Sequence, residues 1–249
     1  HDVICLNKIN DPKDKIIFSG KFKEGINSQY NTITRTLYLL RKKGFLKKIA
    51  FKINIKKNIP HGSGLGGGSI NAASLLSFFK SKMHLKISKN EINQIARSVG
   101  FDVPVGLEKK NTLLTGKGRE IIRINKNFNL NILIVYPKFI CSTKKIYKKN
   151  KKISNLKHLN TLRFNSKNQL LDYLKFESND LQSATINCYP KINKIIKAIK
   201  TQKECHFSRI TGSGSASIGI FSNMEAAIVA QKFIKLKYPK YWSIVSKTI

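Results

Sequence analysis

A run of glycines at residues 62–68 constrains this chain more than any other feature of its sequence. Five of these seven residues are glycine, and the run reads Gly-Ser-Gly-Leu-Gly-Gly-Gly. It follows a segment that alternates apolar and polar residues, as half-buried strands do, and precedes small and apolar residues over a helical length. A turn without Cβ atoms can bend closely around an anion, with the N–H groups of the turn and helix start pointing at it. A plain tight turn needs fewer glycines, so the run predicts a phosphate-binding loop.

The loop differs from the two commonest phosphate-binding motifs. A Walker A loop requires a lysine directly before its closing Ser or Thr, and here Gly68 precedes Ser69. A dinucleotide-binding fingerprint requires a parallel strand–helix–strand unit and an acidic residue at a fixed distance, which do not follow here. The charge of a bound phosphate must therefore be met by other groups. A side chain introduced at Gly67 is expected to enter the cradle and to weaken nucleotide binding on the order of tenfold.

The hydrophobic periodicity predicts strands and helices along the whole chain. Strands are expected at residues 15–21, 49–57, 129–136, 218–221 and 241–249, and helices at 31–42, 70–83, 89–99, 181–199 and 224–236. Asn31 and Ser88 are the expected N-caps of two helices, Glu91 completes a capping box, and Pro190 interrupts the helix that contains it. The Lys- and Asn-rich segment 144–167 is expected to be a mobile excursion with one helix. We predict an α+β protein with two domains, residues 1–127 and 128–249.

Two further motifs carry groups that suit a chemical reaction. In Gly-Phe-Asp-Val-Pro, residues 100–104, Asp102 follows a glycine that ends a helix and precedes a proline that fixes an extended stretch. A carboxylate held there can act as a general base on an alcohol, or it can simply form a turn. Residues 209–217 are a second run of small residues that enters a strand, with hydroxyls at Thr211, Ser213 and Ser215. Such runs also occur as ordinary linkers, so this motif is weak by itself.

The charge of the chain leaves two interpretations open. The 249 residues include 47 basic and 13 acidic ones, a formal net charge of +34, and only seven of the basic residues are arginine. A solvated lysine surface is the favoured interpretation, because arginine is the usual reader of bases and phosphates and is scarce here. A nucleic-acid-binding protein is the alternative, and a phosphorylated small substrate would also be attracted by this charge.

The composition also disfavours several classes of protein. No stretch of about 18 uncharged apolar residues is present, so the sequence predicts no membrane span, and its first residues do not read as a signal peptide. The four cysteines, Cys5, Cys141, Cys188 and Cys205, stand far apart and have no nearby histidine pair. This spacing favours four free thiols in a reducing compartment over a metal site or a disulfide framework.

The three motifs in this order resemble the GHMP kinase superfamily. Within it, the triple glycine after Gly-Leu, the Asp-Val-Pro element and Asn179-Asp180-Leu181 are similar to the 4-diphosphocytidyl-2-C-methyl-D-erythritol kinase family. The resemblance implies a two-domain GHMP kinase fold of class α+β. Its N-terminal domain would be like the second domain of a ribosomal protein, and its C-terminal domain would be a ferredoxin-like α/β plait.

The same resemblance implies an activity and its partners. The reaction would be ATP- and Mg²⁺-dependent phosphorylation of the 2-hydroxyl of a cytidine-diphosphate-linked methylerythritol, in the non-mevalonate isoprenoid pathway. A cytoplasmic monomer or weak homodimer is expected, with no specific nucleic-acid partner and no membrane. Three alternatives stay open: another small-alcohol kinase of the superfamily, an inactive nucleotide-binding relative, and a basic nucleic-acid-binding protein on a related fold.

The resemblance also implies roles for individual residues. Asp102 matches the family's catalytic base, and Asn31 and Lys57 stand where the family contacts adenine. His1 matches a histidine that contacts cytosine in the family. Tyr147 matches an aromatic residue that stacks on the cytosine, and an ordinary exposed aromatic is an equally good interpretation of Tyr147. The ATP-phosphate loop would comprise Pro60, His61, Gly62, Ser63, Gly64, Leu65, Gly66, Gly67, Gly68, Ser69 and Ile70. Substrate contacts are also implied at Thr211, Gly212, Ser213 and Gly214.

Two departures from the family pattern stand out. Ile70 replaces the hydroxyl residue that is usual after Ser69, which removes one phosphate donor. The family's opening strand carries a lysine beside the catalytic Asp, and this sequence begins at His1, downstream of that strand. The expectation is therefore that the sequence is N-terminally incomplete, rather than that the enzyme lacks the lysine.

Overall fold

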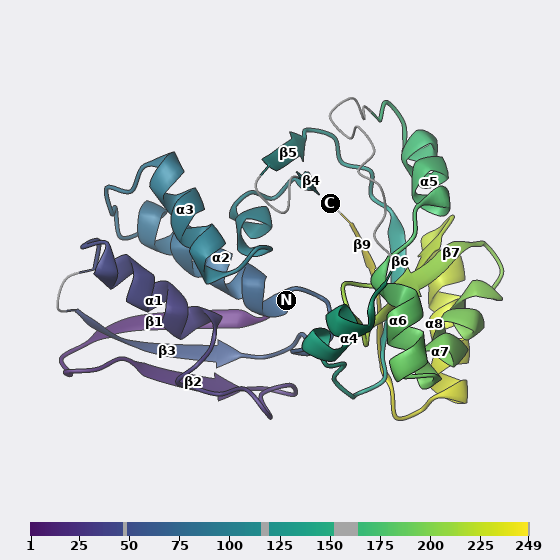
Figure 1. Cartoon of the computed structure of the whole chain (residues 1–249), viewed down its shortest axis with the longest axis horizontal. Helices are drawn as coiled ribbons and strands as arrows, with labels where there is room; N and C mark the ends of the chain where they lie inside the picture. Colours follow the sequence, from purple (N-terminus) through teal and green to yellow (C-terminus); the bar gives the residue numbers. More distant parts are fainter. Residues whose placement is uncertain (47–48, 116–119, 152–163, 249) are drawn as a thin grey trace. The chain divides into compact units, whose positions relative to one another are not determined.

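The computed structural model describes residues 1–46, 49–115, 120–151 and 164–248, and the chain divides into two units (Figure 1). Unit 1 consists of His1–His61 and Gly66–Ile124, and unit 2 of Gly62–Leu65 and Asn125–Ile249. The sequence-based boundary between residues 127 and 128 falls close to the change of unit between 124 and 125. The grouping of residues 62–65 with unit 2 had no signal in the sequence patterns.

Unit 1 is built on a three-stranded sheet with the order β1-β3-β2. Strand β1 (Val3–Ile9) runs antiparallel to β3 (Ala50–Lys56), and β2 (Lys15–Ser19) runs parallel to β3. Phe51 and Ile53 of β3 are fully buried, whereas Lys52 between them is exposed. The alternation in the sequence thus corresponds to one apolar and one solvated face, as predicted.

Three helices cover the apolar face of this sheet: α1 (Thr32–Lys42), α2 (Gly67–Ser81) and α3 (Lys89–Val99) (Figure 1). Their inward side chains join those of β3 in a single core, which includes Leu37, Phe79 and Ile95. The predicted N-caps Asn31 and Ser88 are both present, each within a capping box. Helix α2 begins at Gly67, earlier than predicted, because Gly66 serves as its N-cap and the glycines that follow join the first turn.

A 3₁₀ helix and a hairpin complete unit 1. The 3₁₀ helix η1 (Val103–Leu107) packs against α2, and Gly106 allows the close approach, since a Cβ there would lie 2.8 Å from the Cβ of Ala73. The hairpin consists of the antiparallel strands β4 (Asn111–Thr115) and β5 (Glu120–Ile124). Neither this hairpin nor β1 was predicted from the sequence.

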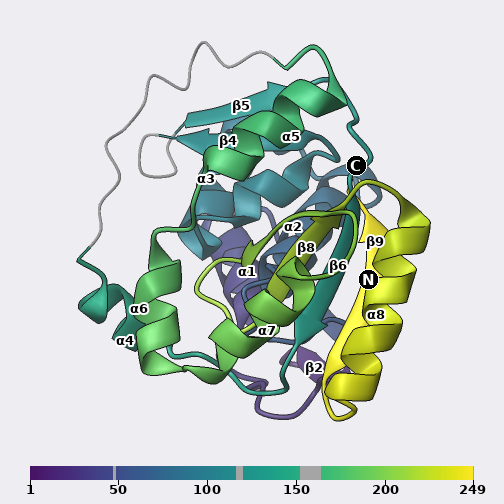
Figure 2. The same ribbon diagram turned by 90° about the vertical axis from the view of Figure 1, so that its right-hand side faces the viewer.

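Unit 2 is built on a four-stranded antiparallel sheet with the order β7-β8-β6-β9. Its strands are β6 (Asn131–Tyr136), β7 (Cys205–Ile210), β8 (Ser217–Phe221) and β9 (Trp242–Lys247). Helices α7 (Lys191–Lys200) and α8 (Met224–Lys237) lie on the same face of the sheet (Figure 2). Their apolar side chains form one core with those of the strands. The chain order β6-α7-β7-β8-α8-β9 with this strand order is the ferredoxin-like α/β plait that the resemblance implied.

Three further helices lie between β6 and α7 in the chain. They are α4 (Thr143–Lys149), α5 (Lys167–Phe176) and α6 (Leu181–Cys188), and α4, α6 and α7 share a second apolar cluster around Ile146 and Ile192. Pro190 is the N-cap of α7 and separates it from α6, as predicted. Of the Lys-rich segment 144–167, residues 152–163 lie outside the described residues. None of the described helices has the length and apolar character that crossing a membrane requires.

Candidate functional site

The glycine-rich loop joins the end of β3 to the start of α2. Its residues Gly62, Gly64 and Gly66 have positive φ values of 63°, 82° and 70°, in the left-handed region that residues with a Cβ rarely adopt. Gly66 is the N-cap of α2, and no side chain in the described part of the protein caps this helix. The N–H groups of the first turn therefore have no acceptor within the helix and lie at the positive end of its dipole. This is a backbone arrangement that binds phosphate groups.

Two contacts hold the loop within unit 1. The hydroxyl of Thr32, the first residue of α1, donates to the carbonyl of Gly68 at 2.8 Å. Nearer the start of the loop, Nε2 of His61 donates to the carbonyl of Glu24 at 2.6 Å. The predicted phosphate-loop residue His61 therefore uses its ring to anchor the loop.

A buried carboxylate, which the sequence analysis missed, connects the two ends of the loop. Oδ1 of Asp2 accepts from the backbone N–H groups of Asn58 and Ile59, both at 2.8 Å. Oδ2 accepts from the amine of Lys57 and from Nδ2 of Asn71, the latter at 2.8 Å. The side chains of Asp2 and Lys57 are 1% and 2% exposed. Burial raises the pKa of Asp2, but these donors outweigh the burial and hold the pKa below its usual value.

Lys57 and Asn31, predicted to contact adenine, both have partners within the protein. The amine of Lys57 is directed at Asp2, as described above. The side chain of Asn31 accepts from the first turn of α1 as its N-cap and donates to the carbonyls of Asn27 and Ser28 at 2.9 and 3.0 Å. Contact of either residue with a nucleotide stays a prediction.

The expectation that a side chain at Gly67 would enter the anion cradle is wrong. A Cβ on Gly67 would lie 3.1 Å from Cγ2 of Ile59 and 3.6 Å from Nζ of Lys57. A side chain there would therefore press on the interior of unit 1. At Gly66, by contrast, a Cβ would have no atom of the described residues within 4 Å, and only the left-handed backbone favours glycine.

In unit 2, residues 62–65 lie against the third motif, residues 209–217. The hydroxyl of Thr211 donates to the carbonyl of Gly64 at 3.0 Å, across a separation of 147 residues, and the N–H of Ala216 donates to the carbonyl of Ser63 at 2.9 Å. A Cβ on Gly64 would lie 2.1 Å from the carbonyl oxygen of Thr211, so the close approach of the two backbones requires glycine. The third motif is therefore not a linker but the partner of the glycine-rich loop.

Asn179 holds the loop at residues 211–214, and Arg209 ties the preceding strand β7 to the end of α5. Nδ2 of Asn179 donates to the carbonyls of Ile210 and Gly212 at 3.2 and 2.8 Å. The guanidinium of Arg209 donates to two backbone carbonyls near the end of α5, at 2.9 and 2.6 Å. The Asn-Asp-Leu element that supported the family resemblance thus has a defined contact: its Asn fixes the backbone of this loop.

Asp102 is the N-cap residue that directly precedes η1. It is exposed, and its carboxylate forms no hydrogen bond or ion pair with any residue that the structure describes. Its backbone is held, because its carbonyl accepts from Val105 at 3.2 Å and Val103 is fully buried. A Cβ on Gly106 of η1 would lie 2.8 Å from Cδ1 of Ile70 in the first turn of α2. Among the described residues, Asp102 is therefore a carboxylate without a partner, next to an element that packs beside the first turn of α2.

A hollow of about 810 Å³ opens beside the N-terminus of α1 in unit 1. The exposed rings of Tyr30 and Tyr38 belong to its wall, and Asn31 and Thr32 contribute to it as well. Because Thr32 also bonds to Gly68, this hollow lies next to the part of the glycine-rich loop that belongs to unit 1.

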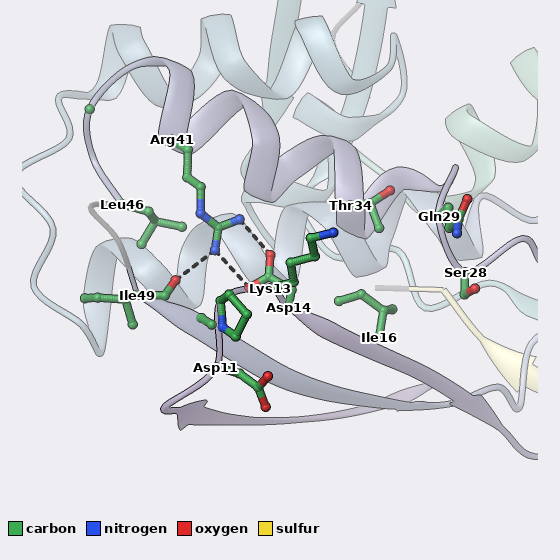
Figure 3. A pocket seen from close by; sticks show the side chains of 13 residues that line it. Asp11, Lys13, Asp14, Ile16, Ser28, Gln29, Thr34, Arg41, Leu46 and Ile49 are labelled. Atoms are coloured by element: carbon green, nitrogen blue, oxygen red, sulfur yellow. Dashed lines mark hydrogen bonds and ion pairs between the residues drawn. The ribbon is translucent and has the colours of Figure 1, made fainter.

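A second hollow in unit 1, of about 1140 Å³, lies beside β2 and α1 (Figure 3). Arg41 reaches from α1 and donates to both carboxylate oxygens of Asp14, at 2.6 and 2.8 Å, and to the carbonyl of Ile49 at 2.8 Å. Asp14 also accepts from the N–H of Phe51 at 2.9 Å. Arg41 and Asp14 thus satisfy each other and the adjacent backbone, which indicates a structural role.

The residues predicted to contact the substrate belong to different units. His1 precedes β1 in unit 1, and its carbonyl accepts from Nδ2 of Asn58 at 2.9 Å. Tyr147 lies on α4 in unit 2, where its side chain is exposed. The hydroxyl of Thr143, the first residue of α4, lies 2.9 Å from that of Ser213. The helix that carries Tyr147 is therefore tied to the predicted substrate loop at residues 211–214.

The four cysteines carry free thiols, and Cys5 is exposed whereas Cys141 is buried. Burial raises the pKa of Cys141 to about 12 and that of Cys205 to about 11. Both thiols are therefore protonated at neutral pH.

Two family models match the chain. The model described as GHMP kinases N terminal domain matches residues 31–108, and the model described as GHMP kinases C terminal matches residues 157–240. The first covers the glycine-rich loop and Asp102, and the second covers the loop at residues 211–214.

Curated proteins named 4-diphosphocytidyl-2-C-methyl-D-erythritol kinase are similar to the chain over most of its length. The protein of Pelagibacter ubique is 36% identical over 252 residues, which covers 100% of this chain and 87% of that protein. The protein of Wolbachia sp. subsp. Brugia malayi is 35% identical over 87% of this chain and 74% of its own length. That of Caldanaerobacter subterraneus subsp. tengcongensis is 31% identical over 100% of this chain and 84% of its own length.

Solved structures share the fold. The crystal structure of a 4-(cytidine 5'-diphospho)-2C-methyl-D-erythritol kinase has a TM-score of 0.74 at 19% identity, and covers 100% of this chain and 86% of that one. The homoserine kinase from Cytophaga hutchinsonii also has a TM-score of 0.74, at 15% identity, and covers 100% of this chain and 85% of that one. Since two kinases with different acceptors match equally well, the fold by itself does not distinguish between acceptor alcohols.

Proposed function

The chain belongs to the GHMP kinase family, and from that premise we propose that it transfers a phosphoryl group from ATP to the 2-hydroxyl of 4-diphosphocytidyl-2-C-methyl-D-erythritol. It is an ATP-dependent kinase, as members of this family are. The acceptor is supported by the sequence relatives, which carry the name of this kinase at identities from 30% to 36%. Such an enzyme acts in the synthesis of isoprenoid precursors.

The observation that carries the proposed reaction is the position of Asp102 within unit 1. Asp102 directly precedes η1 as its N-cap, and η1 packs on the first turn of α2 through Gly106 and Ile70. That turn is also where the N–H groups without helical acceptors can hold phosphate. The proposed anion-binding end of one helix and a carboxylate with no partner among the described residues thus lie on neighbouring elements of the same unit.

Phosphoryl transfer depends mainly on positioning and on stabilising the charge of the transferred group. The N–H groups of residues 67–69 and the hydroxyl of Ser69 would bind the phosphates of ATP. Asp102 would accept the proton of the acceptor hydroxyl as its oxygen forms a bond to the γ-phosphorus. The bond from that phosphorus to the bridging oxygen breaks, and ADP leaves with the negative charge.

We propose that ATP enters as its magnesium complex. Mg²⁺ keeps several waters and needs only one or two protein oxygens in addition to phosphate oxygens. The described residues contain no group of three or more His, Cys, Asp or Glu that could hold a metal ion, so triphosphate oxygens and water would provide most of the ligands of Mg²⁺. The positive charge of Mg²⁺ would help to neutralise the phosphates, because Gly68 occupies the position where a Walker A loop carries a lysine.

The hollow beside α1 is the candidate site for the adenosine end of ATP. Tyr30 and Tyr38 present aromatic rings there, and stacking of a base on an aromatic ring contributes about 1–3 kcal/mol. Thr32 connects this hollow to Gly68, which places it next to the phosphate-binding turn. For the cytidine end, His1 and Tyr147 stay the proposed contacts, on the strength of the family resemblance.

The proposal is tested by measuring ADP release with three acceptors: 4-diphosphocytidyl-2-C-methyl-D-erythritol, homoserine and mevalonate. We expect turnover with the first acceptor only, and competitive inhibition of that turnover by cytidine diphosphate. Turnover with homoserine or mevalonate instead would contradict the proposed identity of the acceptor, but not the family membership. Binding of ATP without turnover on any acceptor would favour an inactive relative.

The net charge of +34 supports a second candidate function, binding of nucleic acid. If the lysines form a generic solvated surface, RNA binding is weak, independent of sequence and lost at moderate salt. A specific RNA complex at physiological salt that ATP does not affect would favour this second function.

We further propose a cytoplasmic location and a monomer or weak homodimer. The four free thiols support the location, because a reducing compartment preserves them. Sedimentation at several protein concentrations tests the oligomeric state.

A further inference from the structure

We propose that Asp2 is a positioning residue for ATP binding, because it connects the strand that leads into the phosphate loop to the helix that leads out of it. The inference rests on the proposed function, since it takes this loop as the site of the ATP phosphates. Asp2 is not expected to touch the nucleotide, because its carboxylate is fully engaged by the protein and 1% exposed.

The contacts of Asp2 come from both ends of the loop. On the side of β3, its carboxylate binds two consecutive backbone N–H groups, at Asn58 and Ile59, and the amine of Lys57. On the side of α2, it binds the side chain of Asn71, which lies in the second turn and is 7% exposed. A glycine-rich loop has few side chains of its own to define its shape, so the separation of its two ends sets the conformation of the backbone between them.

The residues that Asp2 holds are also those that face the first residue of α2. Ile59 and the amine of Lys57 line the position where a side chain of Gly67 would project, at 3.1 and 3.6 Å. A shift of either residue therefore moves the turn whose N–H groups bind phosphate. Asp2 acts on that turn through Ile59 and Lys57 from one side and through Asn71 from the other.

Lys57 is fixed independently of its amine, so it can serve as an anchor. Its N–H donates to the carbonyl of Ser19 at 2.8 Å, and its carbonyl accepts from the N–H of Phe22 at 3.3 Å. Gly20, with φ of 88°, permits this packing, because a Cβ there would lie 2.7 Å from the carbonyl oxygen of Lys57. The end of β2 thus holds the backbone of Lys57 while Asp2 holds its amine.

Unit 1 contains a matched ion pair that does not touch the loop. Asp14 accepts from both terminal nitrogens of Arg41 and from one backbone N–H, and its side chain is 16% exposed (Figure 3). Replacement of Asp14 therefore removes a charged, hydrogen-bonded carboxylate of similar type from the same unit. If the contribution of Asp2 were to stability alone, the two replacements would have the same consequences for ATP.

The test compares Asp2→Ala, Asn71→Ala and Asp14→Ala with the wild-type protein. Thermal unfolding by circular dichroism reports stability, and calorimetric titration with a non-hydrolysable ATP analogue, well below the unfolding temperatures, reports affinity. We expect Asp2→Ala to raise the dissociation constant about tenfold or more, equivalent to about 1.4 kcal/mol. Asn71→Ala keeps the Asp2–Lys57 pair and should raise the dissociation constant by a smaller factor of about three. Asp14→Ala should lower the unfolding temperature and leave the dissociation constant unchanged.

The kinetic constants provide the second measurement. Asp2→Ala should raise the KM for ATP by a similar factor and leave the KM for the acceptor unchanged. Unchanged ATP affinity in Asp2→Ala, or an equal loss in Asp14→Ala, would overturn the inference. If Asp2→Ala does not fold, Asn71→Ala decides, and an unchanged affinity there overturns the inference. A wild-type protein that does not bind the ATP analogue would overturn the proposed function itself, and the inference with it.

Discussion

Replacing Gly64 with alanine is expected to destabilise unit 2 by roughly 3–4 kcal/mol. Alanine in the left-handed conformation that Gly64 adopts, with φ of 82°, costs about 1–2 kcal/mol. Its Cβ would lie 2.1 Å from the carbonyl oxygen of Thr211, so the two backbone segments must separate. Separation weakens the hydrogen bonds from Thr211 to Gly64 and from Ala216 to Ser63, each worth about 1 kcal/mol. The sum of the backbone cost and the two weakened hydrogen bonds gives the expected loss in the free energy of unfolding.

Gly62→Ala is the matched control in the same segment. Gly62 also has a left-handed backbone, with φ of 63°, but the three atoms nearest to its Cβ would all belong to the side chain of Ile140, the first at 2.9 Å, and Ile140 is half exposed. The side chain of Ile140 can turn away, so this variant should lose only the conformational term of about 1–2 kcal/mol. The difference in the free energy of unfolding between the two variants, about 2 kcal/mol, measures the contribution of the close approach of Gly64 to Thr211.

Urea unfolding monitored by tryptophan fluorescence measures both losses. Trp242 is the single tryptophan of the chain and lies on β9, so its emission reports unit 2. With a slope of about 2 kcal/mol per molar urea, Gly64→Ala should lower the midpoint by about 1.5–2 M and Gly62→Ala by less than about 1 M. Equal midpoints for the two variants would refute the close approach. A Gly64→Ala midpoint like that of the wild type would refute the left-handed conformation as well.

Three further predictions follow from single groups in the structure. Asp102→Asn should leave the dissociation constant for ATP unchanged and lower turnover by about 10²-fold or more, and wild-type turnover would exclude Asp102 as the base. The pKa of Asp2 is lowered from 3.8 in the folded protein, so its ionised form stabilises unit 1 above about pH 4, and this stabilisation is lost as the pH falls through the lowered value. The difference in unfolding temperature between wild type and Asp2→Asn should therefore shrink below about pH 4, and a constant difference would contradict this linkage. With a disulfide reagent at about pH 8, Cys5 should react in the native protein, whereas Cys141 and Cys205 should react only after denaturation, because burial raises their pKa values to about 12 and about 11. Equal rates for all thiols before and after denaturation would contradict their burial.

The elements that sequence patterns predicted well are those whose signals are local. Helices α1 and α3 begin at Asn31 and Ser88 because each cap bonds to N–H groups only two or three residues further on. Strand β3 alternates because one face of it meets the helices and the other meets solvent. Nothing beyond the neighbouring residues is needed to recognise these patterns.

Strand β4 of the hairpin, which was not predicted, lacks such a local signal. The residues of β4 are all of intermediate exposure, so no apolar face alternates with a polar one. Strand β1 is defined by its antiparallel pairing with β3, from Val3 opposite Lys56 to Ile9 opposite Ala50. The exposure of β1 nevertheless alternates over residues 3–7, with Ile4 and Leu6 turned to the core, so this strand carried a local signal that was not used.

The sequence by itself determined the chemistry of the site: a glycine-rich turn between a strand and a helix, an aspartate at an element end, and a second run of small residues. Each depends on residue types within one short segment. Only the tertiary structure decided that Gly64 packs against Thr211, that Gly67 faces the interior, and that Asp2 holds both ends of the loop. These contacts join residues distant in sequence, and a hydrogen-bond acceptor or a missing Cβ has no preferred partner until folding brings one within reach. Composition and spacing therefore indicated which groups are expected to bind phosphate, and the fold decided what holds them in position.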